Sequence, residues 1–177
     1  GTKNASIGAY DSAFIHWVCT IFMILAGFNF SLYYRIYKGK FSDLLANTEA
    51  KVYLGVVVTV SLLVTLVLLP SYGTFGKALQ YASFQVASIL TTTGFATADF
   101  DQWPQLARGF LFLLMFVGGC SGSTGGGIKI IRHVVLFKQA GNEMRRLLYP
   151  RGVFSVHLNG KVGRKDVVYG VAGFIYL

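Results

Sequence analysis

Charged side chains are scarce in this sequence. Asp, Glu, Lys and Arg together make up 13% of the 177 residues, whereas about 25% is usual in a soluble domain. Hydrophobic residues make up 54%, and the mean hydropathy is +0.55. Such a composition excludes an ordinary soluble domain and predicts a membrane protein.

Cysteine and histidine are scarce as well. Cys19 and Cys120 both lie in apolar segments, so we expect no structural disulfide, and the pair does not indicate a redox compartment. The three histidines have no spacing typical of metal ligands. No signal peptide opens the sequence, which begins with Gly1 rather than Met, and this favours a fragment or a processed piece.

Two catalytic motifs fail on their spacing. A phosphate-binding P-loop requires Gly, four residues and then Gly-Lys-Ser/Thr. Gly122 and Gly127 fit this pattern, but Ile128 stands at the lysine position. A nucleophile elbow centred on Ser121 has Ser123 where the second glycine belongs. We therefore expect no enzyme, no catalytic residue and no cofactor.

Apolar segments of unequal length divide the chain. Residues 14–34 and 52–69 carry no formal charge, and at ~1.5 Å per residue each can cross a ~30 Å hydrocarbon core. Residues 78–90 are also apolar but too short to span, which suits a re-entrant helix. Residues 106–117 and 128–137 would cross together as one broken helix, with glycines near the middle of the membrane.

Basic residues set the orientation of these segments. They gather between the first two spans and again after the broken helix, and the positive-inside rule places both regions in the cytoplasm. Membrane topology then explains most of the net charge of +9, so a role of residues 138–165 in binding nucleic acid or anionic lipid is disfavoured. Residues 166–177 are the start of another apolar run.

The segment after the short helix predicts an ion filter. Residues 91–96 read Thr-Thr-Thr-Gly-Phe-Ala and lack apolar periodicity, and the glycine permits unusual backbone dihedral angles. The preceding helix would point its partial negative charge at the pore, which favours a cation. Backbone carbonyls could then replace the hydration shell of a cation, as they do in potassium channels. The alternative is a Ser/Thr-rich outer loop. The predicted ion-binding residues are Thr91, Thr92, Thr93, Gly94 and Phe95, with potassium at Thr92, Thr93 and Gly94.

A second polar segment interrupts the broken helix. Residues 118–127 read GGCSGSTGGG, and six glycines in ten residues predict an unwound stretch whose backbone groups need water or protein partners. The alternative is close helix packing through small-xxx-small spacing, but packing alone does not require the polar residues or three consecutive glycines. The predicted gate comprises Gly118, Gly119, Cys120, Ser121, Gly122, Ser123, Thr124, Gly125, Gly126 and Gly127.

Four charged residues flank these segments. Lys129 and Arg132 follow the glycine-rich stretch, where a positive charge would repel permeating cations or pair with an unseen acid. Asp99 and Asp101 could concentrate cations at the outer mouth. Capping of a helix start is the alternative for the aspartates, and we favour it for Asp101.

The two polar segments closely resemble the Trk/Ktr family of potassium-uptake membrane proteins. The similarity lies in residues 91–97 and 118–129, corresponds to the third pore repeat of that family and extends over essentially the whole chain. In that family, one polypeptide carries four non-identical repeats of outer helix, pore helix, filter strand and inner helix around a single pore.

This resemblance implies an all-α membrane fold and a division of the chain. Residues 1–50 would hold the inner helix and cytoplasmic linker of a preceding repeat. A short internal match supports this, because Ala26–Asn29 can be laid on Gly118–Ser121. Residues 51–138 would form one complete repeat, and residues 139–177 a cytoplasmic linker and the start of the next outer helix. The complete repeat would consist of an outer helix at 52–69, a pore helix at 76–90, a filter at 91–96 and a broken inner helix at 105–138.

The resemblance also implies a function. We expect passive translocation of potassium through the filter carbonyls, with residues 118–127 as the gate below. The whole protein would be a multi-pass homodimer in the lipid of a bacterial inner membrane, regulated by a cytosolic nucleotide-binding ring of the TrkA type and without a nucleic-acid partner. Because this chain supplies one filter strand of four, selectivity for potassium over sodium does not follow from it. The alternatives are a secondary cation transporter that uses the broken helix for alternating access, and a structural or assembly module.

Overall fold

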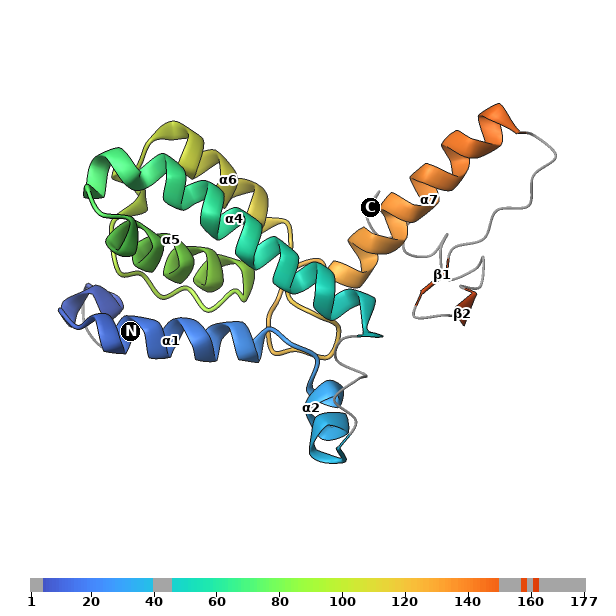
Figure 1. The fold of residues 1–177 in the computed structure, drawn as a ribbon, viewed down its shortest axis with the longest axis horizontal. Helices are drawn as coiled ribbons and strands as arrows, with labels where there is room; N and C mark the ends of the chain where they lie inside the picture. Colours follow the sequence, from blue (N-terminus) through green and yellow to red (C-terminus); the bar gives the residue numbers. More distant parts are fainter. Residues whose placement is uncertain (1–4, 40–45, 150–156, 159–160, 163–177) are drawn as a thin grey trace.

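The computed structural model describes residues 5–39, 46–149, 157–158 and 161–162 (Figure 1). The regular structure in these residues is helical apart from a hairpin with two residues per strand, β1 His157–Leu158 and β2 Lys161–Val162. The all-α fold class is therefore confirmed. The apolar run expected at 166–177 and most of the basic residues expected after position 149 lie outside the described residues.

The first expected span is bent rather than straight. After a short 3-10 helix at Ser6–Ala9, α1 (Ala13–Ala26) and α2 (Phe30–Tyr37) meet at 93°. The prediction of one continuous helix through residues 14–34 is therefore wrong. The bend arises because Asn29 adopts an extended conformation and caps α2, its side chain accepting a hydrogen bond from Ser31 N at 2.8 Å.

The central pair of helices matches the expected outer and re-entrant helices. α4 (Thr48–Tyr72) covers the run predicted at 52–69 and ends at Gly73, whose φ of +65° closes the helix. α5 (Phe75–Leu90) begins two residues later and packs mainly against α4 and α1. α5 has 16 residues and is too short to span a membrane, as expected of a re-entrant helix.

The broken helix is present, with different limits. After a 3-10 helix at Phe100–Gln102, α6 (Gln105–Met115) forms the first half and α7 (Ile130–Leu148) the second. α7 continues past the predicted end at residue 138, so the expected linker at 139–148 is helical instead. Polar side chains one turn apart favour this extension, because Glu143 accepts hydrogen bonds from Gln139 at 2.5 Å and from Arg146 at 3.1 Å.

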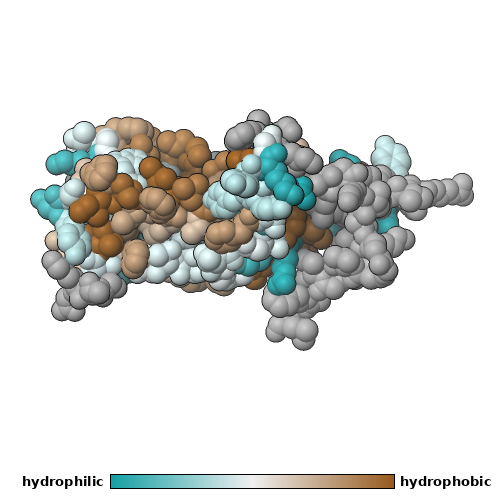
Figure 2. Space-filling model, turned by 90° about the horizontal axis from the view of Figure 1, so that it is seen from below, coloured by the Kyte–Doolittle hydropathy of each residue, from teal (hydrophilic) through white to brown (hydrophobic). Residues whose placement is uncertain are grey.

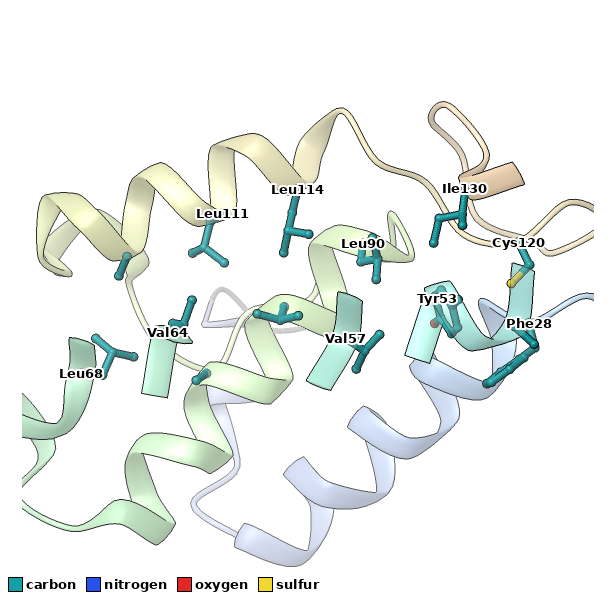
Figure 3. Close-up of a cluster of buried hydrophobic side chains, with 14 of the residues drawn as sticks. Phe28, Tyr53, Val57, Val64, Leu68, Leu90, Leu111, Leu114, Cys120 and Ile130 are labelled. Carbon is teal, nitrogen blue, oxygen red and sulfur yellow. The ribbon is translucent and has the colours of Figure 1, made fainter. Parts of the chain in front are cut away.

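A continuous apolar core joins α4, α5 and α6 (Figure 3). Leu68 and Leu111 are buried at one end of it, whereas Tyr53 and Cys120 are buried at the other end, beside the segment between α6 and α7. The core therefore connects the helical bundle to the glycine-rich stretch. Its fully buried side chains include Tyr53, Val64, Leu68, Leu90, Leu111, Cys120 and Ile130.

Replacing Leu111 by alanine is expected to lower the free energy of unfolding by about 2–5 kcal/mol, because the side chain is 1% exposed and its loss leaves a cavity. Leu113, on the same helix, is 63% exposed, and its replacement by alanine should change stability by about 0.5 kcal/mol at most. Thermal unfolding in detergent measures both, and equal destabilisation by the two variants would contradict this packing.

The outer surface of the helices is apolar. Figure 2, seen from the α1 side, shows hydrophobic residues over the helical body and hydrophilic residues toward its ends. α4 is long and apolar enough to cross a membrane, and α1 with α2 passes the same test as a bent pair. Such a surface suits lipid contact. The exposed side chains include Phe14, Phe22, Leu62, Leu66, Phe112 and Leu113.

Candidate ion filter and gate loop

The segment predicted as the filter is irregular backbone at the C-terminal end of α5. Residues 91–92 form a turn and residues 93–96 have no regular structure, so no hydrogen-bonded strand forms there. Two residues have positive φ, Gly94 at +77° and Thr92 at +55°. The second is unusual, because a β-branched side chain rarely adopts the left-handed conformation.

Ser88, in the last turn of α5, fixes the path of this segment. Its hydroxyl donates to Phe95 O at 2.5 Å, and its carbonyl accepts a hydrogen bond from Thr93 N at 2.9 Å. A single buried serine thus ties the segment to the helix at two points. Ser88 could not be identified from the sequence, because a serine in an apolar helix has no distinctive spacing.

The predicted ion-binding residues differ in burial and in hydrogen bonding. Thr91 is buried, and its hydroxyl contacts Ala87 O at 2.7 Å and the Thr93 hydroxyl at 2.8 Å. Thr92, Thr93 and Gly94 are exposed, and within the described residues their carbonyls accept no hydrogen bond. Phe95 is half-buried, and its carbonyl is taken by Ser88. Three neighbouring carbonyls therefore have free lone pairs beside the negative end of the α5 dipole.

The outer aspartates have a local structural role. Asp99 caps the 3-10 helix, since its carboxylate accepts hydrogen bonds from Asp101 N at 3.1 Å and from Gln102 Nε2 at 3.0 Å. The expectation that Asp101 is the capping residue is therefore wrong. Asp99, two residues earlier, is the one whose side chain accepts from a free N–H group at the start of this helix. Both aspartates are exposed.

The glycine-rich stretch forms a loop whose two ends meet. Residues 116–129 separate α6 from α7, and Gly118 N donates to Ile128 O at 2.8 Å. Ile130 N also donates to Gly119 O at 3.2 Å. A Cβ atom on Gly118 would overlap the carbonyl of Gly126, so the crossing of the two chain segments requires a glycine there.

This loop packs against the bend between α1 and α2 (Figure 1). Cys120 N donates to Gly27 O at 2.9 Å, and Phe30 N donates to Gly122 O at 3.2 Å. Thr124 adds a hydrogen bond from its hydroxyl to the carbonyl of Ala26 at 3.3 Å. The two segments that the internal match relates, 26–29 and 118–121, are thus in contact.

Tyr53 holds the other side of this bend. Its hydroxyl donates to Ile24 O at 2.9 Å, and its ring packs edge-on against Phe28 with centroids 4.9 Å apart. A Cβ atom on Gly27 would lie 2.7 Å from Tyr53 Cζ and 3.0 Å from Thr91 Cγ2. The bend is therefore confined between α4 and the end of α5.

Glu49 is an acidic residue that contacts the glycine-rich loop directly. It lies in the first turn of α4, is 5% exposed, and accepts a hydrogen bond from Ser121 N at 2.5 Å. Glu49 could not be identified as a site residue from the sequence, because an acid at the start of a helix is already explained by the helix dipole. Its contact with a loop 72 positions away has no sequence signature.

Lys129 folds back over the loop that precedes it. Its Nζ donates to Gly125 O and to the Ser123 hydroxyl, the latter at 3.4 Å. The ammonium group thus binds the loop itself. This contact differs from both roles expected for Lys129, which were repulsion of cations and pairing with an acid. Arg132, the other predicted pore-lining charge, lies one turn further along α7 and is half-buried.

The loop also touches the filter segment. Gly126 N donates to the Thr92 hydroxyl at 2.6 Å, and a Cβ atom on Gly125 would lie 3.2 Å from Thr91 O. The structure therefore brings the two predicted segments into direct contact, although 34 residues separate Thr92 from Gly126.

Together these features define a pore-loop membrane protein. A long apolar helix, a short re-entrant helix, an irregular segment with exposed carbonyls and a broken helix follow in that order. The family model described as TrkH, "Cation transport protein", matches residues 74–177. The chain belongs to the TrkH family, whose members are transporters and not enzymes, and the predicted resemblance is confirmed.

Individual relatives agree with this assignment. The Trk system potassium uptake protein TrkH of Halomonas elongata is 39% identical over 99% of this chain and 36% of its own length. The Escherichia coli protein of the same name is 36% identical over 98% of this chain and 36% of its length. The crystal structure of the potassium transporter TrkH from Vibrio parahaemolyticus superposes with a TM-score of 0.93 at 34% identity, over 99% of this chain and 39% of that one. This chain therefore spans well under half of its relatives' length.

Proposed function

We propose that this chain contributes one pore repeat to a protein that carries potassium across a bacterial inner membrane. The observation that supports it most directly is the set of three exposed carbonyls, at Thr92, Thr93 and Gly94, at the end of a re-entrant helix. Carbonyl oxygens in this setting can replace the hydration shell of a cation. The names of the relatives supply potassium as the ion.

Rubidium uptake into vesicles tests this proposal. The vesicles contain the complete polypeptide to which this chain belongs, and uptake is measured with external potassium or sodium as competitor. We expect potassium to suppress uptake at concentrations at which sodium has little effect. Equal competition by the two ions, or no uptake above that of empty vesicles, would contradict the proposal.

Residues 118–127 are assigned the role of gate, and we call them the gate loop. Their contact with Thr91 and Thr92 supports an obstruction at the inner end of the filter. The same contact favours a pore over an alternating-access carrier, because a binding site at the broken helix would need the space that the loop occupies. Glycines let the loop change shape at low conformational cost.

The remaining family features are part of the same proposal. The proposed repeat boundaries at 1–50, 51–138 and 139–177 fall inside helices, since α4 begins at Thr48 and α7 ends at Leu148. A homodimer and a cytosolic nucleotide-binding ring of the TrkA type are proposed as partners. Arg145 and Arg146, in the last turn of α7, lie on the cytoplasmic side that such a ring would contact.

Replacing Glu49 by alanine is expected to raise rubidium uptake about tenfold, because a hydrogen bond to a charged group is worth about 1.5–3 kcal/mol. Without the carboxylate, Ser121 N loses its partner and the closed loop loses an anchor. Glu143→Ala removes the same charge from an exposed pair with Arg146 on α7 and is the matched control. A similar rise in both variants would indicate a general charge effect and contradict this role of Glu49.

A further inference from the structure

One peptide group of the gate loop is held at both of its ends. Between Gly125 and Gly126, the carbonyl oxygen accepts a hydrogen bond from Lys129 Nζ. The N–H of the same peptide donates to the Thr92 hydroxyl at 2.6 Å. Lys129, at the N-terminal end of α7, and Thr92, in the filter segment, therefore bind the same peptide group.

The two hydrogen bonds reinforce each other. An ammonium group on the carbonyl oxygen polarises the peptide, which makes its N–H a stronger donor. The approach also depends on glycine, since a Cβ atom on Gly126 would lie 3.3 Å from Thr92 Oγ1 and one on Gly125 would lie 3.2 Å from Thr91 O. Larger residues at these two positions would push the loop away from the filter.

Thr92 is in an unfavourable conformation while this contact exists. Its φ of +55° is rare for a β-branched residue, and such strain persists only where the surroundings hold it. Thr92 N donates to Ile89 O at 3.0 Å on one side, and the hydroxyl is held by the loop on the other. Release of the hydroxyl would remove one of these two restraints.

We propose that the Thr92 hydroxyl is a latch that couples the filter to the gate loop. With the latch closed, the loop lies against the inner end of the filter and Thr92 keeps its left-handed conformation. When the loop leaves, Thr92 is freed and its carbonyl, one of the three exposed ones, can change orientation. Thr92 is thus a positioning residue for the gate, and this inference rests on the gate proposed above.

A double-mutant comparison of rubidium uptake by the complete transporter tests the latch. Thr92→Val keeps the β-branched shape and removes the acceptor. In the intact protein we expect it to raise uptake between about threefold and tenfold, as the loss of one hydrogen bond implies. Thr92→Ser restores the acceptor and should reverse most of this rise. In a background that lacks residues 121–126, Thr92→Val should produce no further rise.

Thr93→Val is the matched control, because the Thr93 hydroxyl contacts Thr91 and not the loop. Its effect on uptake, whatever its size, should be the same in both backgrounds. If Thr92→Val does not fold, Lys129→Met tests the other end of the same peptide group and should raise uptake only when the loop is present.

Two results would overturn the latch alone. In one, loop removal raises uptake while Thr92→Val in the intact protein has no effect. In the other, Thr92→Val changes uptake by the same factor in both backgrounds, which would place its action within the filter. Loop removal without any effect on uptake would instead overturn the proposed gate, and the latch with it.

Discussion

With alanine in place of Gly94, the complete protein is expected to lose the preference for potassium over sodium that we propose for this filter. The φ of Gly94 is +77°, a conformation that costs an L-residue roughly 1–2 kcal/mol. No heavy atom lies within 4 Å of the position that a Cβ would occupy, so the effect arises from backbone strain and not from a clash. The segment should relax toward negative φ and turn the neighbouring carbonyls away from their present directions.

Competition measures this loss. Rubidium uptake by the Gly94→Ala protein should be suppressed equally by potassium and by sodium, or fall to background. Gly109→Ala is the matched control, because Gly109 lies in helix α6, a Cβ there would also meet no atom within 4 Å, and its φ is not positive. Unchanged discrimination by Gly94→Ala would remove Gly94 from the filter and return the broken helix to the alternating-access interpretation.

Local patterns were sufficient to predict the framework of this repeat. The uncharged run at 52–69 indicates α4, and a run too short to span indicates α5, because length and hydropathy depend on neighbouring residues. The gate loop is predictable for the same reason, since six glycines in ten residues cannot remain helical. These features depend on composition and spacing alone.

Contacts between distant residues could not be predicted in this way. Ser121 meets Glu49 across 72 positions, and Gly126 meets Thr92 across 34. The bend at Gly27 is a further example, because 14–34 has the length and hydropathy of one straight span. Only the packed structure shows that Tyr53 and the gate loop occupy the two sides of that bend.

The two segments of the internal match, 26–29 and 118–121, both interrupt helices, and the structure shows them in contact. Residues 26–29 leave the helix beside residues 118–122, and each segment supplies hydrogen-bond partners that the other lacks. Backbone groups released at one break, where lipid offers no partner, are satisfied at the other. A movement of the gate loop must therefore expose Gly27 O and Phe30 N, unless water reaches them through the pore.

Removal of residues 121–126 is expected to raise rubidium uptake by at least about a hundredfold. Residues 121–126 make four hydrogen bonds to the protein outside residues 116–129, with partners in Ala26, Phe30, Glu49 and Thr92. At roughly 1 kcal/mol each, and with 1.4 kcal/mol equal to a factor of ten, the loss of about 3 of these roughly 4 kcal/mol accounts for this increase.

A length-matched variant separates obstruction by the loop from its anchoring. Glycine at positions 121, 123 and 124 keeps the loop over the filter but removes the Thr124 hydroxyl that binds Ala26. The backbone bonds to Gly27, Phe30 and Thr92 remain available, so uptake should rise far less than in the shortened protein. One result would contradict the gate: uptake by the shortened protein equals that of the unmodified protein, and potassium still suppresses this uptake selectively. Residues 118–127 would then pack the inner helix rather than close the pore, and the gate would lie elsewhere on the permeation path.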